Sequence, residues 1–388
     1  MRDSDTGIYL DNAATTALDE SVLAAMLPYL TTVSGNPSSL HHAGRLARRG
    51  VEQAREQVAG VLGVRPRQVT FTSGATEADN LAIRGVMASR PGVLISSATE
   101  HAAVLGTCQA LRSSGRDVVL LEPTASGEVP AAALEEALER AAVRGGTALV
   151  ALMHVNNETG VITDVRAAAE LAHAAGALFF CDAVQAAGLE DVSLAASGAD
   201  IISLSGHKIN GPKGVGVLVK RDEVTIEPQL AGGSQEQGIR PGTHAVSAIV
   251  GMGAALELAE SRRIDERARL AAVQAELETL CSAIAGVSLN GAGAVRGVKH
   301  SSFSVAGVDG EALLMALDDA GVYVSAGSAC AAGSLEPSHV LLAMGLSERH
   351  AKASVRFSLG TATTVADVRE AARRFATVIE RCRAVAVA

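Results

Sequence analysis

Apolar runs alternate with amphipathic stretches over the first two thirds of the chain. Seven short apolar runs, typical of buried strands, lie at 69–73, 93–97, 118–122, 148–155, 177–183, 201–206 and 215–220. Between most of them, helical spacing is found in stretches rich in Ala, Leu and Glu, at 77–88, 101–112, 130–143 and 164–175. This alternation predicts an α/β fold with a parallel or mostly parallel sheet covered on both faces. Ligands of such sheets bind at the carboxyl ends of the strands.

The pattern changes after about residue 258. A long charged helix is predicted at 262–285, and helices are also predicted at 309–320 and 364–383. Short strand patterns accompany them at VSLN, SSFSVAG, VYVSAG and RFSLG. This α+β order predicts a second, smaller domain. We expect a large domain at 15–258 and a small domain made of 1–14 and 259–388.

Small side chains dominate the composition. Of the 388 residues 48% are apolar, yet there are six Phe, three Tyr, no Trp and 39 Gly. The core must therefore be packed from Ala, Val, Leu and Ile, and a disordered chain is excluded. The formal charge of −9 is opposite to that of a nucleic-acid binder. The sequence shows no signal-like apolar segment and no membrane-length apolar run, so we expect a cytoplasmic protein without nucleic-acid or membrane partners.

The five cysteines are widely spaced and form no C-x-x-C pair. Neither a disulfide framework nor a zinc cluster fits this number and spacing. Four of them, Cys108, Cys181, Cys281 and Cys382, lie within apolar helix or strand patterns and are expected to pack as small apolar groups. Cys330 differs because it lies in SAGSACAAGS (325–334), a segment suited to present an accessible thiolate. The alternative is a buried cysteine in a tight turn.

The segment FTSGATEADN (71–80) joins a predicted strand to a predicted helix. Main-chain N–H groups at Gly74, Ala75 and Thr76, together with the Thr76 hydroxyl, would form a phosphate site at the helix N-terminus. The alternative is that Thr76 only caps the helix, with Asp79 closing a capping box.

Two further segments place polar groups directly after strands. FFCDAVQ (179–185) brings Asp182 and Gln185 to the expected start of a helix, where Asp182 could pair with a protonated ring nitrogen or merely cap the helix. SLSGHKINGPKG (203–214) places Ser205, His207 and Lys208 in a Gly-rich turn. A lysine there can bond covalently to a carbonyl cofactor, although most lysines are solvated surface groups.

The S-x-x-K spacing of Ser205 and Lys208 also matches an acylating serine enzyme, but the companion motifs S-D-N and K-T-G are absent from the sequence. His101 follows a strand and could stack on a ring or transfer protons. Arg356 lies within an apolar strand, where its guanidinium suits a substrate carboxylate or a structural ion pair.

Taken together and in this order, these segments closely resemble the cysteine desulfurases of the NifS/IscS type, which belong to the pyridoxal-phosphate enzymes of class-V aminotransferase type. The stretches that carry the resemblance span nearly the whole chain: YLDNAATT (9–16), GNPSSLH (35–41), TSGATEADNLA (72–82), TEHAAVL (99–105), HVNNETG (154–160), DAVQAAG (182–188), SGHKINGPKG (205–214), GIRPGTHAV (238–246), GSACAAGSLEPSHVLLAMGL (327–346) and VRFSLG (355–360). The resemblance implies the fold of the aspartate aminotransferase-like transferases, fold type I.

The resemblance also implies a role for each matching residue. Lys208 would hold pyridoxal 5'-phosphate covalently and act as the proton-transfer base, and Asp182 would pair with the pyridine nitrogen. The other cofactor contacts implied are His101 stacked on the ring, Gln185 and Asn157 at the ring hydroxyl, Ala75, Thr76, Ser205 and His207 at the phosphate, and Thr243 from the second subunit of a homodimer. Arg356, with Asn36 and Asn157, would bind the carboxylate of L-cysteine.

The implied reaction converts L-cysteine to L-alanine and leaves the sulfur on Cys330 as a persulfide, for donation to an acceptor protein in iron–sulfur cluster assembly or a thiolation pathway. Three features depart from the family pattern: the residues around Cys330, Thr159 in HVNNETG, and an end at Ala388 short of a longer tail. The alternatives are a selenocysteine lyase, a cysteine or cystine lyase that forms no persulfide, and a sulfur-relay module with a vestigial cofactor site. Cys330 argues against the lyase without a persulfide, and Lys208 with Asp182 argues against the vestigial site.

Overall fold

The computed structural model describes residues 7–326 and 336–387; Cys330 lies outside the described residues. The strands are β1 (Ile8–Tyr9), β2 (Val69–Thr72), β3 (Val93–Ser97), β4 (Val118–Leu121), β5 (Thr147–Met153), β6 (Leu178–Asp182), β7 (Ile201–Ser205), β8 (Gly216–Lys220), β9 (Val287–Leu289), β10 (His300–Val305), β11 (Val322–Tyr323) and β12 (Ser354–Ser358). The helices are α1 (Glu20–Thr31), α2 (His42–Leu62), α3 (Ala75–Ser89), α4 (Ala102–Ser113), α5 (Ala131–Ala142), α6 (Val165–Ala174), α7 (Leu194–Ser197), α8 (Val246–Ser282), α9 (Gly310–Asp319), α10 (His339–Ala343), α11 (Glu348–Lys352) and α12 (Val365–Val387).

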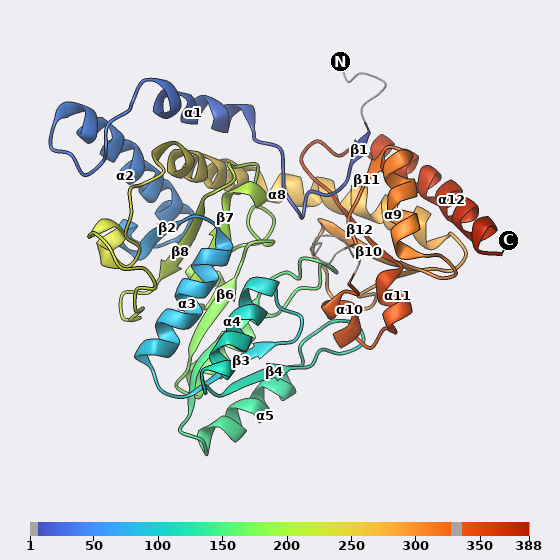
Figure 1. Ribbon diagram of the computed structural model, residues 1–388, viewed down its shortest axis with the longest axis horizontal. Coiled ribbons are helices and arrows are strands. Elements are labelled where there is room, and N and C mark those ends of the chain that lie inside the picture. Colours follow the sequence, from blue (N-terminus) through green and yellow to red (C-terminus); the bar gives the residue numbers. More distant parts are fainter. Residues whose placement is uncertain (1–6, 327–335, 388) are drawn as a thin grey trace.

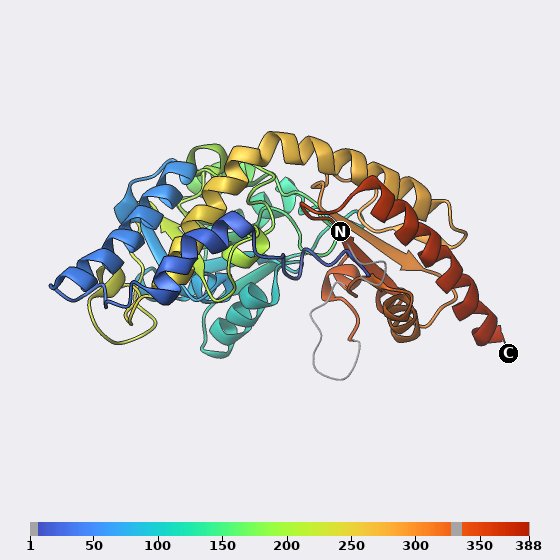
Figure 2. The same ribbon diagram turned by 90° about the horizontal axis from the view of Figure 1, so that it is seen from above.

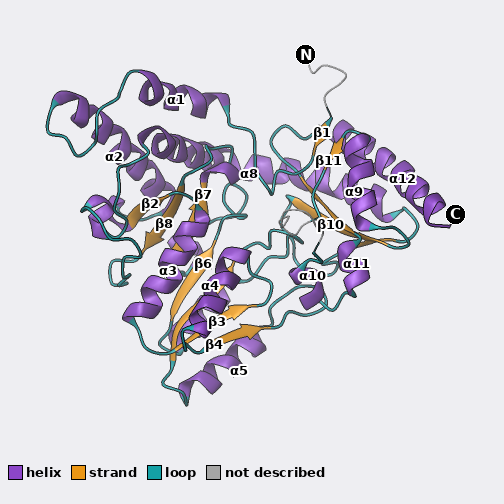
Figure 3. Cartoon of the chain, in the orientation of Figure 1, coloured by secondary structure: helices purple, strands orange, loops and turns teal. Residues whose placement is uncertain are grey.

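The seven predicted strands form one sheet in the order β2-β8-β7-β6-β5-β3-β4 (Figures 1 and 3). β8 runs antiparallel to both of its neighbours, and the other pairs are parallel. β8 runs antiparallel to β7 because residues 206–215, which join the two strands, contain no helical crossover. A parallel pair of consecutive strands needs such a crossover. The prediction of a mostly parallel sheet is confirmed.

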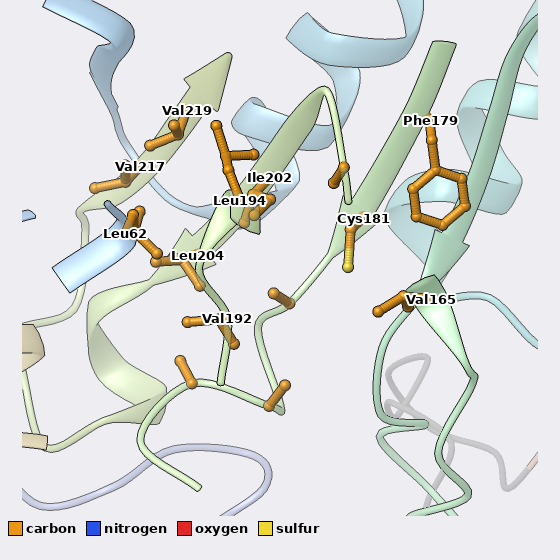
Figure 4. Close-up of a cluster of buried hydrophobic side chains, with 14 of the residues drawn as sticks. Leu62, Val165, Phe179, Cys181, Val192, Leu194, Ile202, Leu204, Val217 and Val219 are labelled. Carbon is orange, nitrogen blue, oxygen red and sulfur yellow. The ribbon is translucent and has the colours of Figure 1, made fainter. Parts of the chain in front are cut away.

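Alternate residues of the strands face two separate cores. Phe179, Ile202 and Val217 pack on the side of α2, α5, α6 and α8 (Figure 4). Phe180 and Ile201 pack on the other side, against α3 and α4. Both faces are thus apolar and covered, which is why the strands have continuous apolar runs in the sequence.

Helix α8 differs from the prediction at its N-terminal end. It begins at Val246 instead of near residue 262, because the apolar residues before the charged stretch continue the helix and are buried, among them Ile249, Met252 and Leu256. A Cβ at Gly253 would lie 2.7 Å from Ala54 Cα, so this glycine lets α2 lie close against α8. Figure 2 shows α8 reaching from the helices on the large sheet to the second sheet. The sequence reasoning did not identify α1 and α2.

A second group of elements follows residue 287 and includes the N-terminal strand. β12, β10 and β9 form an antiparallel sheet, and β1 pairs in parallel with β11. Their core holds three of the six phenylalanines, Phe303, Phe357 and Phe375, with ring centroids 5.3 to 6.5 Å apart. Within 7–326 and 336–387, the model contains no helix with the length and apolar character needed to cross a membrane.

Candidate active site

Polar residues gather where β6 and β7 end, at the boundary with the second group of elements. Asp182 is the last residue of β6 and pairs in register with Ser203 of β7. Ser205 ends β7, and Lys208 follows in a turn of 3-10 helix. The carboxyl edge of the sheet therefore carries the predicted groups, as this fold class leads one to expect.

Lys208 is directed toward the N-terminal segment. Its Nζ donates hydrogen bonds to the carbonyl oxygens of Ala13 at 2.6 Å and Ala14 at 2.8 Å. Burial lowers the pKa of Lys208 to about 8, assisted by the charge of Arg356 and opposed by Asp11 and Asp182. About a tenth of this amine is therefore uncharged at pH 7, far more than for an ordinary lysine, and a nucleophile or proton acceptor requires the uncharged form.

Asp182 is buried, and no described cation forms an ion pair with it. Its Oδ1 accepts a hydrogen bond from the Val184 N–H at 3.0 Å, in a turn at 184–189 where a helix was predicted. Burial raises the pKa of Asp182, while the Val184 hydrogen bond and the charges of His101 and Lys208 oppose the rise. The alternative that Asp182 caps a helix is wrong, because its carboxylate closes a turn.

Two further carboxyl groups lie beneath Asp182. Asp79 accepts a 2.6 Å hydrogen bond from the Ser203 hydroxyl, and Glu100 accepts one from the Met153 N–H at 3.0 Å. Burial raises the pKa of both carboxyl groups well above the usual values, and the charge of Asp182 adds to the rise. These residues were not identified as supports of the site, because their partners are distant in sequence.

His101 is the N-cap residue of α4, where its Nδ1 accepts a hydrogen bond from the Ala103 N–H at 3.2 Å. Burial lowers the pKa of His101, so the neutral ring dominates at neutral pH. With Nδ1 accepting, the ring proton lies on Nε2. His101 is thus presented as a neutral ring beside Asp182 and Lys208.

The N-terminus of α3 lies next to the end of β7. Ser205 pairs with Gly216, and a Cβ on Gly216 would lie 2.5 Å from the main chain of Gly74. Gly74 occupies the N-cap position and no side chain caps α3. The capping-box alternative for Thr76 and Asp79 is therefore wrong, and the first N–H groups of the helix, at Ala75 and Thr76, have no side-chain acceptor.

His207 borders the same region and bonds through Nδ1 to the Thr15 hydroxyl at 3.2 Å. Burial lowers the pKa of His207 to about 4, and the charges of Lys208, Lys213 and Lys299 add to this effect. His207 thus lies among three lysines, and positive charge of this kind favours an anion such as phosphate.

Arg356 is buried in β12 and forms the ion pair that was one of its two predicted roles. Its Nη2 lies 2.8 Å from Asp11 Oδ1, and its Nη1 donates to the Asn157 carbonyl oxygen at 2.8 Å. Its Nε and the side-chain Oδ1 of Asn157 are both buried without a hydrogen-bond partner among the described residues. The two residues therefore retain unused donor and acceptor groups for a ligand.

Gln185 is held by groups that the sequence reasoning did not identify. Its Nε2 donates to the Ala13 carbonyl at 3.0 Å, and its Oε1 lies 3.2 Å from His300 Nε2. Lys299, next to His300, donates to the Lys208 carbonyl at 3.2 Å. The motif YLDNAATT was a usable signal for the first contact, while Lys299 and His300 belong to none of the matched motifs.

Two predicted residues of the described chain are not brought to this cluster within one chain. Thr243 and Asn36 are exposed, and Asn36 accepts a hydrogen bond from the Ser38 N–H. The connection between α1 and α2, which includes Asn36, lies far from β12 in Figures 1 and 2. Cys330 lies outside the described residues.

The residues present fit pyridoxal 5'-phosphate. Asp182 is a buried carboxylate that lacks a cation, and a protonated ring nitrogen would supply one. The amine of Lys208 suits a carbonyl group, and the uncapped start of α3 suits a phosphate.

Comparison with known proteins agrees with this geometry. The family model for aminotransferase class-V matches residues 8–370. The chain belongs to this family. As a class-V aminotransferase it is dependent on pyridoxal phosphate. It is 42% identical to cysteine desulfurase 2 of Trichormus variabilis, over 97% of this chain and 94% of the relative.

Two solved structures are also similar to this class-V aminotransferase. A NifS-like protein matches with a TM-score of 0.90 and 32% identity, over 97% of this chain and 100% of that chain. A structure of SspA in complex with cysteine matches with a TM-score of 0.79 and 36% identity, over 90% of this chain and 98% of that chain. These matches confirm the fold class.

Proposed function

We propose that the protein is a cysteine desulfurase that takes sulfur from L-cysteine, releases L-alanine and leaves the sulfur on Cys330. The observation that carries the proposal is that an amine with a low pKa, Lys208, and a buried carboxylate, Asp182, lie at the same edge of a class-V aminotransferase sheet. We infer that the substrate is L-cysteine because the sequence is similar to that of a cysteine desulfurase and the structure is similar to one that contains cysteine.

The chemistry that pyridoxal phosphate supplies when bound is an electron sink for the substrate α-carbon. Lys208 holds the cofactor and then moves the α-proton, since its amine is substantially uncharged near pH 8. Asp182 would keep the ring nitrogen of the bound cofactor protonated. Gln185 and Asn157 would serve the ring hydroxyl, and His101 would face the ring as a neutral imidazole. Ala75, Thr76, Ser205 and His207 would hold the phosphate.

The free guanidinium N–H of Arg356 and the side chain of Asn157 receive the carboxylate of L-cysteine. The Cys330 thiolate then attacks the substrate sulfur. The carbon–sulfur bond of L-cysteine breaks and a sulfur–sulfur bond to Cys330 forms, while a proton completes the methyl group of alanine. Thiol and L-cysteine thus become persulfide and L-alanine without an added reductant. The persulfide is handed to an acceptor protein.

A homodimer is part of the proposal. Leu23, Leu27 and Leu30 recur on one face of α1 and are 45%, 52% and 56% exposed, whereas Val22 and Met26 on the other face are buried. An exposed leucine face of this kind is typical of an interface. Thr243 and Asn36 would then serve the site of the second subunit.

The deciding experiment incubates the cofactor-loaded protein with L-cysteine, measures alanine and maps persulfide by mass spectrometry. Cys330→Ala is expected to lose the persulfide and alanine formation, while Cys382→Ala, which alters a partly buried cysteine of α12, retains both. Alanine formed at the parent rate by Cys330→Ala would overturn the role of Cys330. Lys208→Ala is expected to lose the visible absorption band of the lysine-bound cofactor, and a band that persisted would overturn the anchor.

A further inference from the structure

A pocket lies behind Lys208, between the large sheet and the second group of elements. It has a volume of about 60 Å³, and its lining includes Lys208, Ile209 and Asn210 on one side and α8 on the other. Six apolar side chains complete the walls: Ala187, Leu189, Leu258, Ala259, Leu270 and Leu359. The volume suits about four to six water-sized groups.

Lys299 is a buried cation of this lining that has no ion-pair partner among the described residues. It is only 6% exposed, and its ammonium has one hydrogen bond, to the Lys208 carbonyl. No carboxylate of the described residues forms an ion pair with it. The two acidic lining residues are already paired, Asp19 with Arg262 at 3.3 Å and Glu266 with Arg269 at 2.7 Å. An ammonium has three donors, so two remain for a ligand.

We propose that this pocket binds a short-chain carboxylate, with the carboxylate on Lys299 and the aliphatic part against the leucines. A buried cation is costly without a partner, and an anion would satisfy it. The apolar walls favour a ligand with an aliphatic part over a fully hydrated inorganic anion. Acetate and propionate have the number of heavy atoms that the volume allows.

The electrostatic surroundings of Lys299 make the binding dependent on pH. Burial lowers the pKa of Lys299 to about 7, and the charges of Lys208 and Arg356 add to this effect. The nearby rings of His207 and His300 have lowered pKa values and are neutral at that pH. Arg262, Asp19 and Glu266 are the other charged lining groups. A carboxylate binds the ammonium form, so its affinity is expected to fall up to about tenfold per pH unit above 7.

The test of this site is independent of the proposed reaction, because binding is measured without turnover. Propionate is titrated calorimetrically into the cofactor-loaded protein at pH 6.5, with saturating L-alanine present to occupy the substrate carboxylate site. Binding to the parent protein and an at least tenfold loss in Lys299→Met are expected. Lys299→Gln serves as a second variant that keeps a polar group.

Lys220→Met is the matched control, because Lys220 is also partly buried, bonds to a main-chain carbonyl and lies on β8 outside this lining. It is expected to bind as the parent does. Two results would each overturn the site: absence of binding to the parent protein, or equal affinity in Lys299→Met.

Discussion

Arg356 and Asp11 form a 2.8 Å ion pair that connects β12 to the residues just after β1. Arg356 is almost fully buried, whereas the Asp11 side chain is 22% exposed. The pair orients the guanidinium, so that its Nε is left free for a substrate. Because Asp11 also raises the pKa of Lys208, this carboxylate acts on both the proposed substrate residue and the proposed cofactor residue.

Asp11→Asn is expected to lower the free energy of unfolding by about 1–3 kcal/mol, because a buried guanidinium loses its charged partner. The pKa of Lys208 is expected to fall further below about 8, since a group that raises it is removed. Urea unfolding and the pH dependence of Lys208 acylation in the cofactor-free protein measure the two effects. Glu276→Gln, which breaks the exposed pair with Arg369, is the control and is expected to change stability by less than about 1 kcal/mol. An unchanged Lys208 titration in Asp11→Asn would contradict the electrostatic link.

His101 combines a structural and a proposed functional role, and two substitutions separate them. Asn can replace the N-cap acceptor of α4, whereas Ala cannot, so His101→Ala is expected to be about 1 kcal/mol less stable than His101→Asn. Both variants are expected to lose turnover by about 10²-fold or more, because neither retains a ring or its proton. Parent-like turnover in His101→Asn would show that the cap is the only role.

Glu236 anchors the segment that leads to Thr243. Its carboxylate accepts hydrogen bonds from Arg55 at 2.7 and 2.8 Å and from Phe71 N–H at 2.9 Å, and lies 2.7 Å from His244 Nε2. Glu236→Gln is expected to cost about 3–5 kcal/mol of stability, because Arg55 loses its buried partner and keeps only the 3.2 Å pair with the exposed Glu52. It is also expected to weaken cofactor binding if Thr243 serves a second subunit.

The buried pair of Glu236 and Arg55 makes the stability of the protein sensitive to acid. Hydrogen bonds from Arg55 and His244 to the Glu236 carboxylate lower the pKa of Glu236 to about 2 from the usual 4.5. Its contribution to stability is therefore present above about pH 4.5 and is lost as the pH falls through 2. Glu77→Gln, which breaks the more exposed pair with Arg240, is the control and is expected to cost less. Equal losses of stability in Glu236→Gln and Glu77→Gln would contradict the prediction that the more buried ion pair contributes more to stability.

If the protein forms the proposed homodimer, Leu27→Glu is expected to convert it to a monomer, because this change places a charge at the centre of the exposed leucine face of α1. Light scattering measures the mass. Met315→Glu introduces the same charge at a 65% exposed position of α9 and is expected to remain dimeric. A dimeric Leu27→Glu protein would place the interface elsewhere.

Lys299 and Lys208 should together make stability rise with pH. Both have folded-state pKa values, about 7 and about 8, below the usual 10.5, so the unfolded chain binds more protons between those values and 10.5. Each contribution to the free energy of unfolding rises by up to about 1.4 kcal/mol per pH unit in that window. The advantage of Lys299→Met over the parent, both free of cofactor, is therefore expected to shrink from pH 7 to pH 9. A constant difference would contradict the low pKa of Lys299.

The strands of the large sheet and the helices α3 to α6 could be predicted because each is determined by a local apolar pattern. The part of the site that could be predicted consists of residues at or just after strand ends, such as Asp182 and Lys208. What could not be predicted depends on partners far along the chain. Asp79 suggested a local cap but bonds to Ser203, and Arg356 pairs with Asp11 across 345 residues. The start of α8 was missed because its first turns are apolar on a chain where apolar runs otherwise mark strands.

The parallel pairing of β1 with β11 has a consequence for how the protein is made on the ribosome. All strands of the large sheet have been synthesised once the chain reaches Lys220. Ile8, in contrast, can pair only after Val322 has been synthesised. Since domains fold during synthesis from the N-terminal side, the first strand is among the last to find its place. Ala13 and Ala14, whose carbonyls hold the Lys208 amine, follow directly on that strand. The nascent chain therefore completes the surroundings of Lys208 only when translation is nearly finished.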